Sequence, residues 1–109
     1  MLTKGAELNM AGVHGITPLH NAAFCGYNDV AELLIAKGAD INMTNQYGET
    51  PLVTAVIYER KDLVMLLLAK GADPNIADVF GRTPQSIAEH QKHIDIANIL
   101  KEHNCKKNP

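Results

Sequence analysis

One short motif, Gly-x-Thr-Pro, recurs in this chain at a fixed step of 33 residues, and the recurrence constrains the fold more than any other feature. It occupies residues 15–18, 48–51 and 81–84. A second motif, Gly-Ala-(Asp or Glu)-x-Asn, keeps the same step at residues 5–9, 38–42 and 71–75. Self-similarity at such a period is typical of stacked units, each of which buries its apolar face against a neighbour. We therefore expect a repeat protein rather than a single globular core.

The middle repeat, residues 45–77, indicates how one unit is built. The Thr50 hydroxyl can cap a helix, and Pro51 suits the first helical position, where an N–H would have no partner. A short apolar helix is expected to follow, and the next apolar pattern predicts a second helix over about 62–70. Gly71 then ends that helix, because glycine adopts the left-handed conformation cheaply. An extended, hairpin-like loop is expected to lead into the next unit.

The Gly-x-Thr-Pro-Leu-His and Gly-Ala-Asp-x-Asn motifs at this spacing resemble the ankyrin repeat, and the resemblance covers essentially the whole chain. It implies an all-α repeat fold (an α-solenoid) of helix-turn-helix units joined by β-hairpin-like loops. The first helices and hairpin tips would line a concave face, and the second helices would form the convex back. Four parts are expected: the end of a truncated preceding repeat (1–11), two repeats (12–44 and 45–77), and a C-terminal capping repeat with a polar tail (78–109).

The last repeat departs from the pattern in ways that indicate a cap. Gln85, Glu89 and Lys92 replace a core leucine, a small alanine and the glycine between the helices. Polar groups on the side that has no further neighbour keep the end of a stack in solution. The polar tail, residues 101–109, is expected to fray. Glu59 replaces the same glycine in the middle repeat, and because a left-handed residue other than glycine costs about 1 kcal/mol, we expect the turn to change type at both positions.

The start of the chain suggests a different situation. Residues 1–5 align with residues 34–38, so the chain begins in the last turn of a second helix whose own repeat is missing. No cap is expected over the apolar flank of the 12–44 repeat. The sequence therefore predicts either a fragment of a longer protein, or an edge that a partner or a second copy covers.

Composition argues against several classes of protein. A net charge of −2 does not suit the basic surface that nucleic-acid binding requires. No apolar run approaches the roughly 20 residues that span a bilayer, and no signal peptide is recognisable. Cys25 and Cys105 lie at non-equivalent positions of different repeats, so no disulfide is expected. An intracellular location, cytoplasmic or nuclear, follows as the expectation.

Candidate binding residues fall at hairpin tips and first-helix ends, the positions that vary with the partner in ankyrin-like proteins. We expect an apolar strip along the concave side, made by Phe24, Ile57, Tyr58, Tyr47 and Phe80. Aromatic side chains are enriched at binding hot spots because they bury much area at low entropic cost. Further partner contacts are expected from Cys25 and from a polar rim of His14, Glu49, Arg82 and His90. The alternative is that some of these rings pack locally, which is the interpretation we favour for Tyr27.

Catalytic and cofactor chemistry is not indicated. The sequence lacks a phosphate-cradling glycine loop, a nucleophile elbow and a convergent carboxylate pair, so we expect no enzyme activity and no cofactor. Four residues of the two types that commonly bind zinc lie near the C-terminus: His90, His93, His103 and Cys105. The first two are three apart on a predicted helix, but no zinc spacing is matched and no metal is expected. For His20, the resemblance implies a structural role through a buried hydrogen bond to Thr17 or to an adjacent repeat.

Two asparagines are candidates for modification. Asn42 and Asn75 close their repeats, each eight residues after a leucine. They resemble the asparagines that the oxygen-sensing asparaginyl hydroxylase modifies in many ankyrin-repeat proteins. The simpler interpretation, which hydroxylation would only supplement, is that the side chain ties the hairpin together through backbone hydrogen bonds.

The sequence thus predicts a protein-interaction module, a scaffold or adaptor that binds a peptide or protein partner on its concave face. Nucleic-acid binding and membrane insertion are not expected. Two alternatives remain: a targeting or regulatory domain of a larger multidomain enzyme, and a structural spacer that self-associates through its uncapped N-terminal edge. The fold does not choose between them, because one fold serves many functions.

Overall fold

The computed structural model describes residues 12–107, with side chains described through Asn104. Within this part of the chain the structure is helical and contains no strand. The elements are η1 (Val13–Gly15), α2 (Pro18–Cys25), α3 (Asn28–Ala36), α4 (Pro51–Ile57), α5 (Lys61–Ala69), α6 (Pro84–His90) and α7 (Ile94–Lys107). The expected all-α repeat is confirmed, whereas the truncated repeat expected at residues 1–11 lies outside the described residues.

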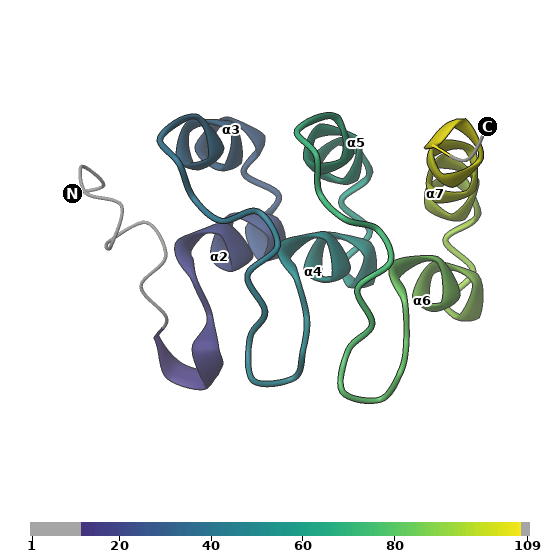
Figure 1. The fold of residues 1–109 in the computed structure, drawn as a ribbon, viewed down its shortest axis with the longest axis horizontal. Coiled ribbons are helices and arrows are strands. Elements are labelled where there is room, and N and C mark those ends of the chain that lie inside the picture. The colour runs from purple at the N-terminus through teal and green to yellow at the C-terminus, as the bar shows by residue number, and fades with distance from the viewer. Residues whose placement is uncertain (1–11, 108–109) are drawn as a thin grey trace.

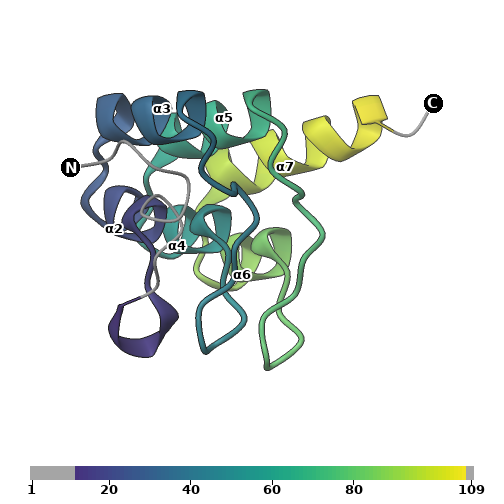
Figure 2. The same cartoon turned by 60° about the vertical axis from the view of Figure 1, so that its left-hand side comes forward.

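The α-helices of the described residues, α2 to α7, form two layers of three (Figure 1). The first helices of the units, α2, α4 and α6, lie side by side in one layer, and α3, α5 and α7 form the other. Each helix packs on its counterpart in the next unit and on its own partner. The connecting loops project beyond the layer of first helices, as a second view shows (Figure 2). The molecule therefore presents one surface where loops and first helices meet, and a separate back made of second helices.

The threonine of the repeated motif starts each first helix. The Thr17, Thr50 and Thr83 hydroxyls accept hydrogen bonds from the backbone N–H three residues on, at 3.3, 3.2 and 3.2 Å. Proline follows each threonine at the first helical position. This arrangement satisfies one otherwise unpaired helical N–H and fixes where the chain enters the helix. The prediction made from Thr50 and Pro51 is confirmed.

A single apolar core runs through the stack between the two layers. Its fully buried leucines come from all three units and include Leu19, Leu34, Leu52, Leu67 and Leu100. Alanines at equivalent positions of the first helices are also buried, which lets neighbouring helices approach closely: Ala22, Ala55 and Ala88. Gln85 stands where the first two repeats have buried leucines and is only half-buried. The last unit therefore has the polar substitution expected of a cap.

The loops between units are joined to one another by backbone hydrogen bonds. Gln46 N–H donates to His14 O and Val79 N–H donates to Tyr47 O, each at 2.9 Å. Gly48 has φ +74°, and a Cβ there would lie 2.9 Å from the Val79 backbone nitrogen. Contact this close between consecutive loops leaves no room for a side chain. The hairpin-like loops thus form a continuous ledge along one side of the stack.

The turn between the two helices does not change type where its glycine is replaced, so that expectation is wrong. Glu59 has φ 57° and Lys92 has φ 63°, close to the φ 77° of Gly26. The next residue donates its backbone N–H into the first helix in every unit: Tyr27 to Ala22 at 2.9 Å, Arg60 to Ala55 at 2.8 Å, and His93 to Ala88 at 2.8 Å. This shared hydrogen bond and the packing of the helix pair outweigh a conformational cost of about 1 kcal/mol.

The C-terminal segment also differs from expectation. Helix α7 continues through Lys107, so the fraying predicted from residue 101 onward is not found up to that point. The physical reason is visible in the register, because Asn104 stands where Gly38 and Gly71 end the earlier second helices. Without a glycine, nothing forces the helix to stop there.

Candidate functional site

A hollow of about 330 Å³ opens where α2, α4 and the loop between units meet. Its lining combines aromatic rings with amide, hydroxyl and carboxylate groups: Ile16, His20, Asn21, Phe24, Asn45, Tyr47, Glu49, Thr54 and Tyr58. The helices supply the floor and the loop supplies one wall. We call this the inner hollow.

Two rings form one end of the inner hollow. Phe24 at the end of α2 and Tyr58 just after α4 lie 4.6 Å apart between ring centroids, at 81° to each other. This edge-to-face geometry is favourable for aromatic pairs. Arg60 fixes the backbone beneath them, because its Nε and Nη2 donate to Phe24 O at 3.1 and 2.9 Å. About half of each ring remains exposed, which leaves area for a partner.

The wall of the inner hollow is a hairpin loop organised by the buried Asn45. Asn45 Oδ1 accepts from the backbone N–H of Tyr47 at 2.9 Å and of Glu49 at 3.0 Å. Asn45 Nδ2 donates to Glu49 Oε1 at 3.0 Å. The Tyr47 ring is thereby placed beside His14, with ring centroids 6.1 Å apart. These bonds hold Tyr47 and Glu49 on one rigid loop.

His20 links the floor of the inner hollow to this wall. Its Nε2 lies 2.7 Å from Glu49 O, and a carbonyl can only accept, so Nε2 carries the proton. Nδ1 must then be the acceptor, and it receives Thr17 N–H at 3.2 Å and lies 2.8 Å from Thr17 Oγ1. Burial lowers the pKa of His20 below its ordinary 6.5, although the contacts with Glu49 act in the opposite direction. The ring is neutral and structural, which agrees with the role that the resemblance implied.

The structure brings some of the expected binding residues together and separates others. Phe24, Tyr47, Glu49 and Tyr58 all line the inner hollow, with His14 beside Tyr47. Ile57, half-buried against the core, and Phe80, which is 73% exposed, do not line it. The single apolar strip expected from five residues is therefore interrupted in the structure.

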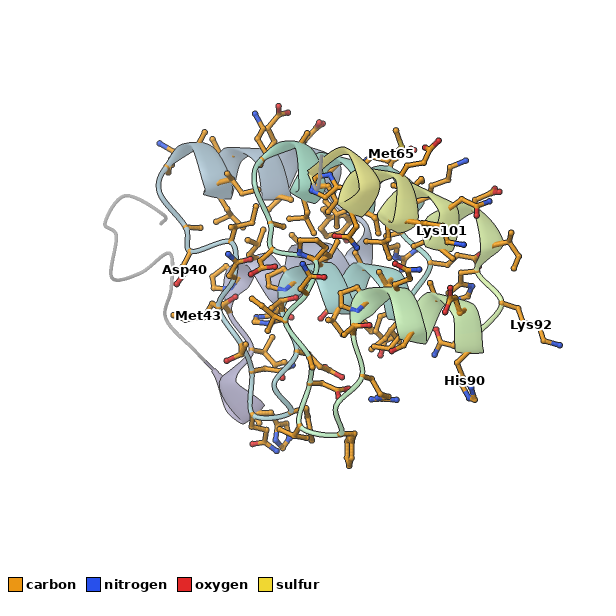
Figure 3. The ribbon with its side chains drawn as sticks, turned by 45° about the vertical axis from the view of Figure 1, so that its right-hand side comes forward. Asp40, Met43, Met65, His90, Lys92 and Lys101 are labelled. Atoms are coloured by element: carbon orange, nitrogen blue, oxygen red, sulfur yellow. The ribbon has the colours of Figure 1, made fainter. Side chains whose placement is uncertain are left out.

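The remaining candidates lie elsewhere on the surface. Cys25 is exposed and lines a neighbouring, mostly polar hollow with Arg60. Arg82 and His90 line a third hollow on the last unit. Figure 3 shows His90 and Lys92 projecting outward at that end of the molecule. Helix α6 ends at His90, so His90 and His93 do not share a helix as the sequence had suggested.

The loop of the last unit repeats the geometry of the middle one with different chemistry. Asp78 Oδ1 accepts from the backbone N–H of Phe80 and Arg82, each at 2.9 Å, and Arg82 Nε donates to Asp78 Oδ2 at 2.8 Å. Burial acts to raise the Asp78 pKa, but these hydrogen bonds and the Arg82 charge outweigh it and hold the pKa below 3.8. The Arg82 guanidinium also lies over the Phe80 ring, 5.3 Å from its centroid.

Several lining residues were not among the candidates chosen from the sequence. Asn21 and Thr54 are equivalent under the 33-residue step, and they could have been found because both fall on the inner side of a first helix. Asn45 carried no such signal, because its role depends on its bonds to Tyr47 and Glu49. Tyr27 was expected to pack locally, yet it is 59% exposed and lies outside the inner hollow.

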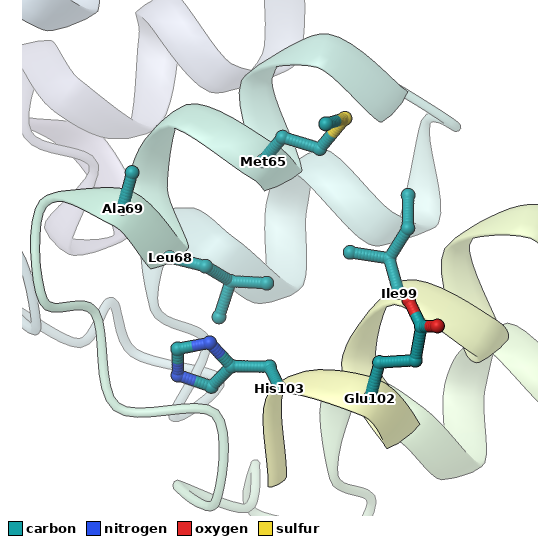
Figure 4. A pocket seen from close by; sticks show the side chains of 6 residues that line it. All are labelled: Met65, Leu68, Ala69, Ile99, Glu102 and His103. Atoms are coloured by element: carbon teal, nitrogen blue, oxygen red, sulfur yellow. The ribbon is translucent and has the colours of Figure 1, made fainter. Parts of the chain in front are cut away.

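A further hollow of about 300 Å³ lies on the back of the stack between α5 and α7 (Figure 4). Its apolar lining comes from Met65, Leu68, Ala69 and Ile99, with Glu102 and His103 from α7. In the close-up, Leu68 points toward His103 across the gap. It contains no aromatic ring other than the imidazole, so it offers less of the chemistry typical of binding hot spots than the inner hollow does.

The two candidate hydroxylation sites differ in their bonding. Asn42 Oδ1 accepts from the Asp73 backbone N–H in the next loop at 2.9 Å, so it ties two units together. Asn75 is exposed, and its backbone N–H donates to Asp73 Oδ1 at 2.9 Å. The hairpin-tying role expected for these asparagines is thus seen for the Asn42 side chain.

Within residues 12–104, no group of three or more potential ligands is placed to hold a metal ion. His93 lies 3.5 Å from a Glu59 carboxylate oxygen instead. Likewise, none of the described helices combines the length and the apolar character needed to cross a membrane.

Comparison with known proteins agrees with this architecture. The family model for ankyrin repeats (3 copies) matches residues 19–109, which is most of the chain. The chain therefore belongs to the ankyrin-repeat family, whose members are generally non-catalytic protein-interaction modules. A search of curated proteins gave no match.

Proposed function

We propose that this chain is a protein-interaction module that binds a peptide or protein partner in the inner hollow. The observation that carries the proposal is the set of three half-exposed rings, Phe24, Tyr47 and Tyr58, around one concave surface with polar groups between them. Exposed aromatic groups gathered in this way mark interaction sites more often than chance exposure does. The partner is proposed to meet this site inside the cell.

Preorganisation supports the same conclusion. Arg60 holds the backbone of Phe24, and Asn45 holds the loop that carries Tyr47 and Glu49. Groups already fixed in a binding geometry lose little conformational entropy when a partner arrives. The other candidates lie apart from this centre, so we assign Cys25, Arg82 and His90 to the periphery of the interface, together with Ile57 and Phe80.

The test is a capture experiment from cell lysate with two matched variants. One variant carries Phe24→Ala, Tyr47→Ala and Tyr58→Ala; the other carries Tyr27→Ala and Met65→Ala, which removes exposed apolar side chains outside the proposed interface. We expect proteins captured by the wild type to be kept by the second variant and lost by the first, with both variants folded by circular dichroism. Equal capture by all three proteins would move the binding site away from the inner hollow.

A second candidate is self-association through the N-terminal edge. Val30 and Leu33 on α3 are 42% and 49% exposed, whereas Leu63, the counterpart of Val30 in the next unit, is buried. Light scattering at two concentrations separates this candidate from partner binding, because only self-association raises the mass with concentration. Either activity could serve targeting within a larger enzyme, as the sequence allowed.

Hydroxylation is proposed as an addition to binding rather than as a replacement for it. Asn75 is the better candidate because its side chain is exposed, whereas Asn42 would have to give up its bond to Asp73. Mass spectrometry of the protein isolated from cells tests this directly: a gain of one oxygen at Asn75 is expected, and unmodified Asn75 would contradict the proposal.

A further inference from the structure

The inner hollow has a charge of one sign only. Among its lining residues, Glu49 carries the one formal charge. Oε1 of its carboxylate accepts from Asn45, while Oε2 makes no ion pair or hydrogen bond within the described part of the chain. His20 is neutral because its Nδ1 accepts a backbone N–H. A cationic group entering this space would therefore find a carboxylate and no competing positive charge.

Arg60, the cation that contacts the Phe24 end of the inner hollow, is already engaged elsewhere. Arg60 directs Nε and Nη2 at Phe24 O and lines the adjacent hollow beside Cys25. The Arg60 guanidinium thus holds the backbone of Phe24 and makes no ion pair with Glu49. The aromatic faces of the inner hollow thus adjoin a carboxylate that the rest of the described chain leaves without a charged partner.

The last unit shows what such a ring attracts. Under the 33-residue step, Phe80 corresponds to Tyr47 and Arg82 corresponds to Glu49. In the last unit the chain places its own guanidinium over the ring, at 5.3 Å. In the middle unit the equivalent ring, Tyr47, is followed two residues later by the carboxylate of Glu49 instead of an arginine. The middle unit therefore supplies no guanidinium of its own for the Tyr47 ring, and a partner can supply one. A flat guanidinium stacks on aromatic faces and pairs with carboxylates, and a compact ammonium does this less well.

We propose that the inner hollow receives an arginine side chain of the partner, with its guanidinium against the Phe24, Tyr47 and Tyr58 rings and its N–H groups directed at Glu49. This inference rests on the proposed function and makes it more specific. The partner segment is thus a peptide or exposed loop with an arginine at its centre. Asn45 and Thr54 are engaged within the chain, so the Asn21 amide and the Tyr47 and Tyr58 hydroxyls are the lining groups available for the backbone on either side of that arginine.

The experiment uses three peptides that differ at one position: Gly-Ser-X-Ser-Gly with X as arginine, lysine or citrulline. Citrulline keeps the shape and planarity of arginine but has no charge, which makes it the matched control. Binding is followed by nuclear magnetic resonance on the ring signals of Phe24, Tyr47 and Tyr58 in the full chain. We expect the arginine peptide to shift these signals and to bind roughly tenfold more tightly than the citrulline peptide, since hydrogen bonds to charged groups are the stronger ones.

A protein variant gives the reciprocal test. Glu49→Gln removes the charge but keeps an oxygen that can accept from Asn45, so the loop should stay folded, and Glu102→Gln on α7 removes the same charge far from the inner hollow. We expect Glu49→Gln to reduce arginine binding to the citrulline level and Glu102→Gln to leave it unchanged. Equal binding of arginine and citrulline to the wild type would overturn the charge pairing while leaving a peptide-binding hollow. A lysine peptide as tight as arginine would overturn the assignment to a guanidinium, and no shift with any peptide would count against the inner hollow itself.

Discussion

His20 joins two repeats because both of its ring nitrogens are used, one toward Thr17 in its own unit and one toward Glu49 O in the next. Such a ring works only when it is neutral, since a protonated Nδ1 could no longer accept. A single residue of the repeated motif thus couples helix capping to the position of the loop that forms the wall of the inner hollow. At this scale, the chemistry of one side chain determines how two units fit together.

This arrangement predicts a pH dependence. The pKa of His20 is below 6.5 in the folded chain and near 6.5 in the unfolded chain, so the unfolded chain takes up the proton first as the pH falls. The stabilisation should be complete above about pH 7 and decline as the pH drops through 6.5 toward the folded pKa. Denaturation by urea at pH 7.5 and 5.5 measures this change in the free energy of unfolding.

The variant His20→Gln supplies the control. At pH 7.5 it should be less stable than the wild type by about 1–3 kcal/mol, because buried partners lose a hydrogen bond. At pH 5.5 the difference should shrink, since only the wild type is destabilised by protonation at this site. A difference that is the same at both pH values would show that His20 does not titrate in this way.

At the scale of elements, the turn between the two helices of a unit requires a left-handed backbone even where the residue does not favour one. All three units keep a left-handed residue there, although two of them have no glycine. The hydrogen bond that follows the turn and the packing of each helix pair hold the backbone in place. Local propensity alone predicted a different turn, and it failed because tertiary contacts are stronger than one residue's preference.

That strain can be relieved. Lys92 projects outward and lies at φ 63°, so Lys92→Gly should stabilise the chain by about 0.5–1 kcal/mol, or a few degrees in Tm. The opposite change at the equivalent position, Gly26→Ala, should destabilise it, because φ is +77° and a Cβ would lie 3.1 Å from Arg60 Cδ. Thermal unfolding followed by circular dichroism compares the two, and a lower Tm for Lys92→Gly would contradict the strain argument.

Sequence reasoning succeeded where one residue type carries the signal. The Thr-Pro starts of α2, α4 and α6 were predictable because a hydroxyl cap is local chemistry, and the unit length followed from the motif step. The end of α7 was predicted wrongly, because the polar composition of residues 101–109 was given more weight than the missing glycine at position 104. The inner hollow was predicted only in part: Phe24, Tyr47 and Tyr58 were found as exposed rings, but Asn45 acts through bonds that only the folded loop creates.

At the scale of the whole molecule, the middle unit holds the stack together. Helix α4 packs on α2, α5 and α6, and six of its residues from Pro51 to Val56 are buried. The end units have one neighbour each within the described residues. Stability in such a stack is close to a sum of units and interfaces, so damage to the middle removes two interfaces at once.

A substitution in the buried core of the middle unit tests whether this unit holds the stack together. Leu52→Ala near the start of α4 should cost about 2–5 kcal/mol and lower the whole unfolding transition, because Leu52 is fully buried and its truncation leaves a cavity in the core. Leu33→Ala on α3, where the side chain is 49% exposed, should cost less than about 1 kcal/mol. Chemical denaturation measures both. Similar losses for the two variants would contradict the central place of the buried α4 side chain in the stability of the stack.

The most direct test of the central claim, that the inner hollow is the partner site, is site-specific photo-crosslinking in cells. A benzoylphenylalanine is placed at Tyr58 inside the inner hollow or at Met65 on the back of the stack, two positions of similar exposure. Light should then produce a discrete crosslinked partner from position 58 and none from position 65. Crosslinks to a partner from position 65 alone would place the binding surface on the second helices and contradict the assignment of the partner site to the inner hollow.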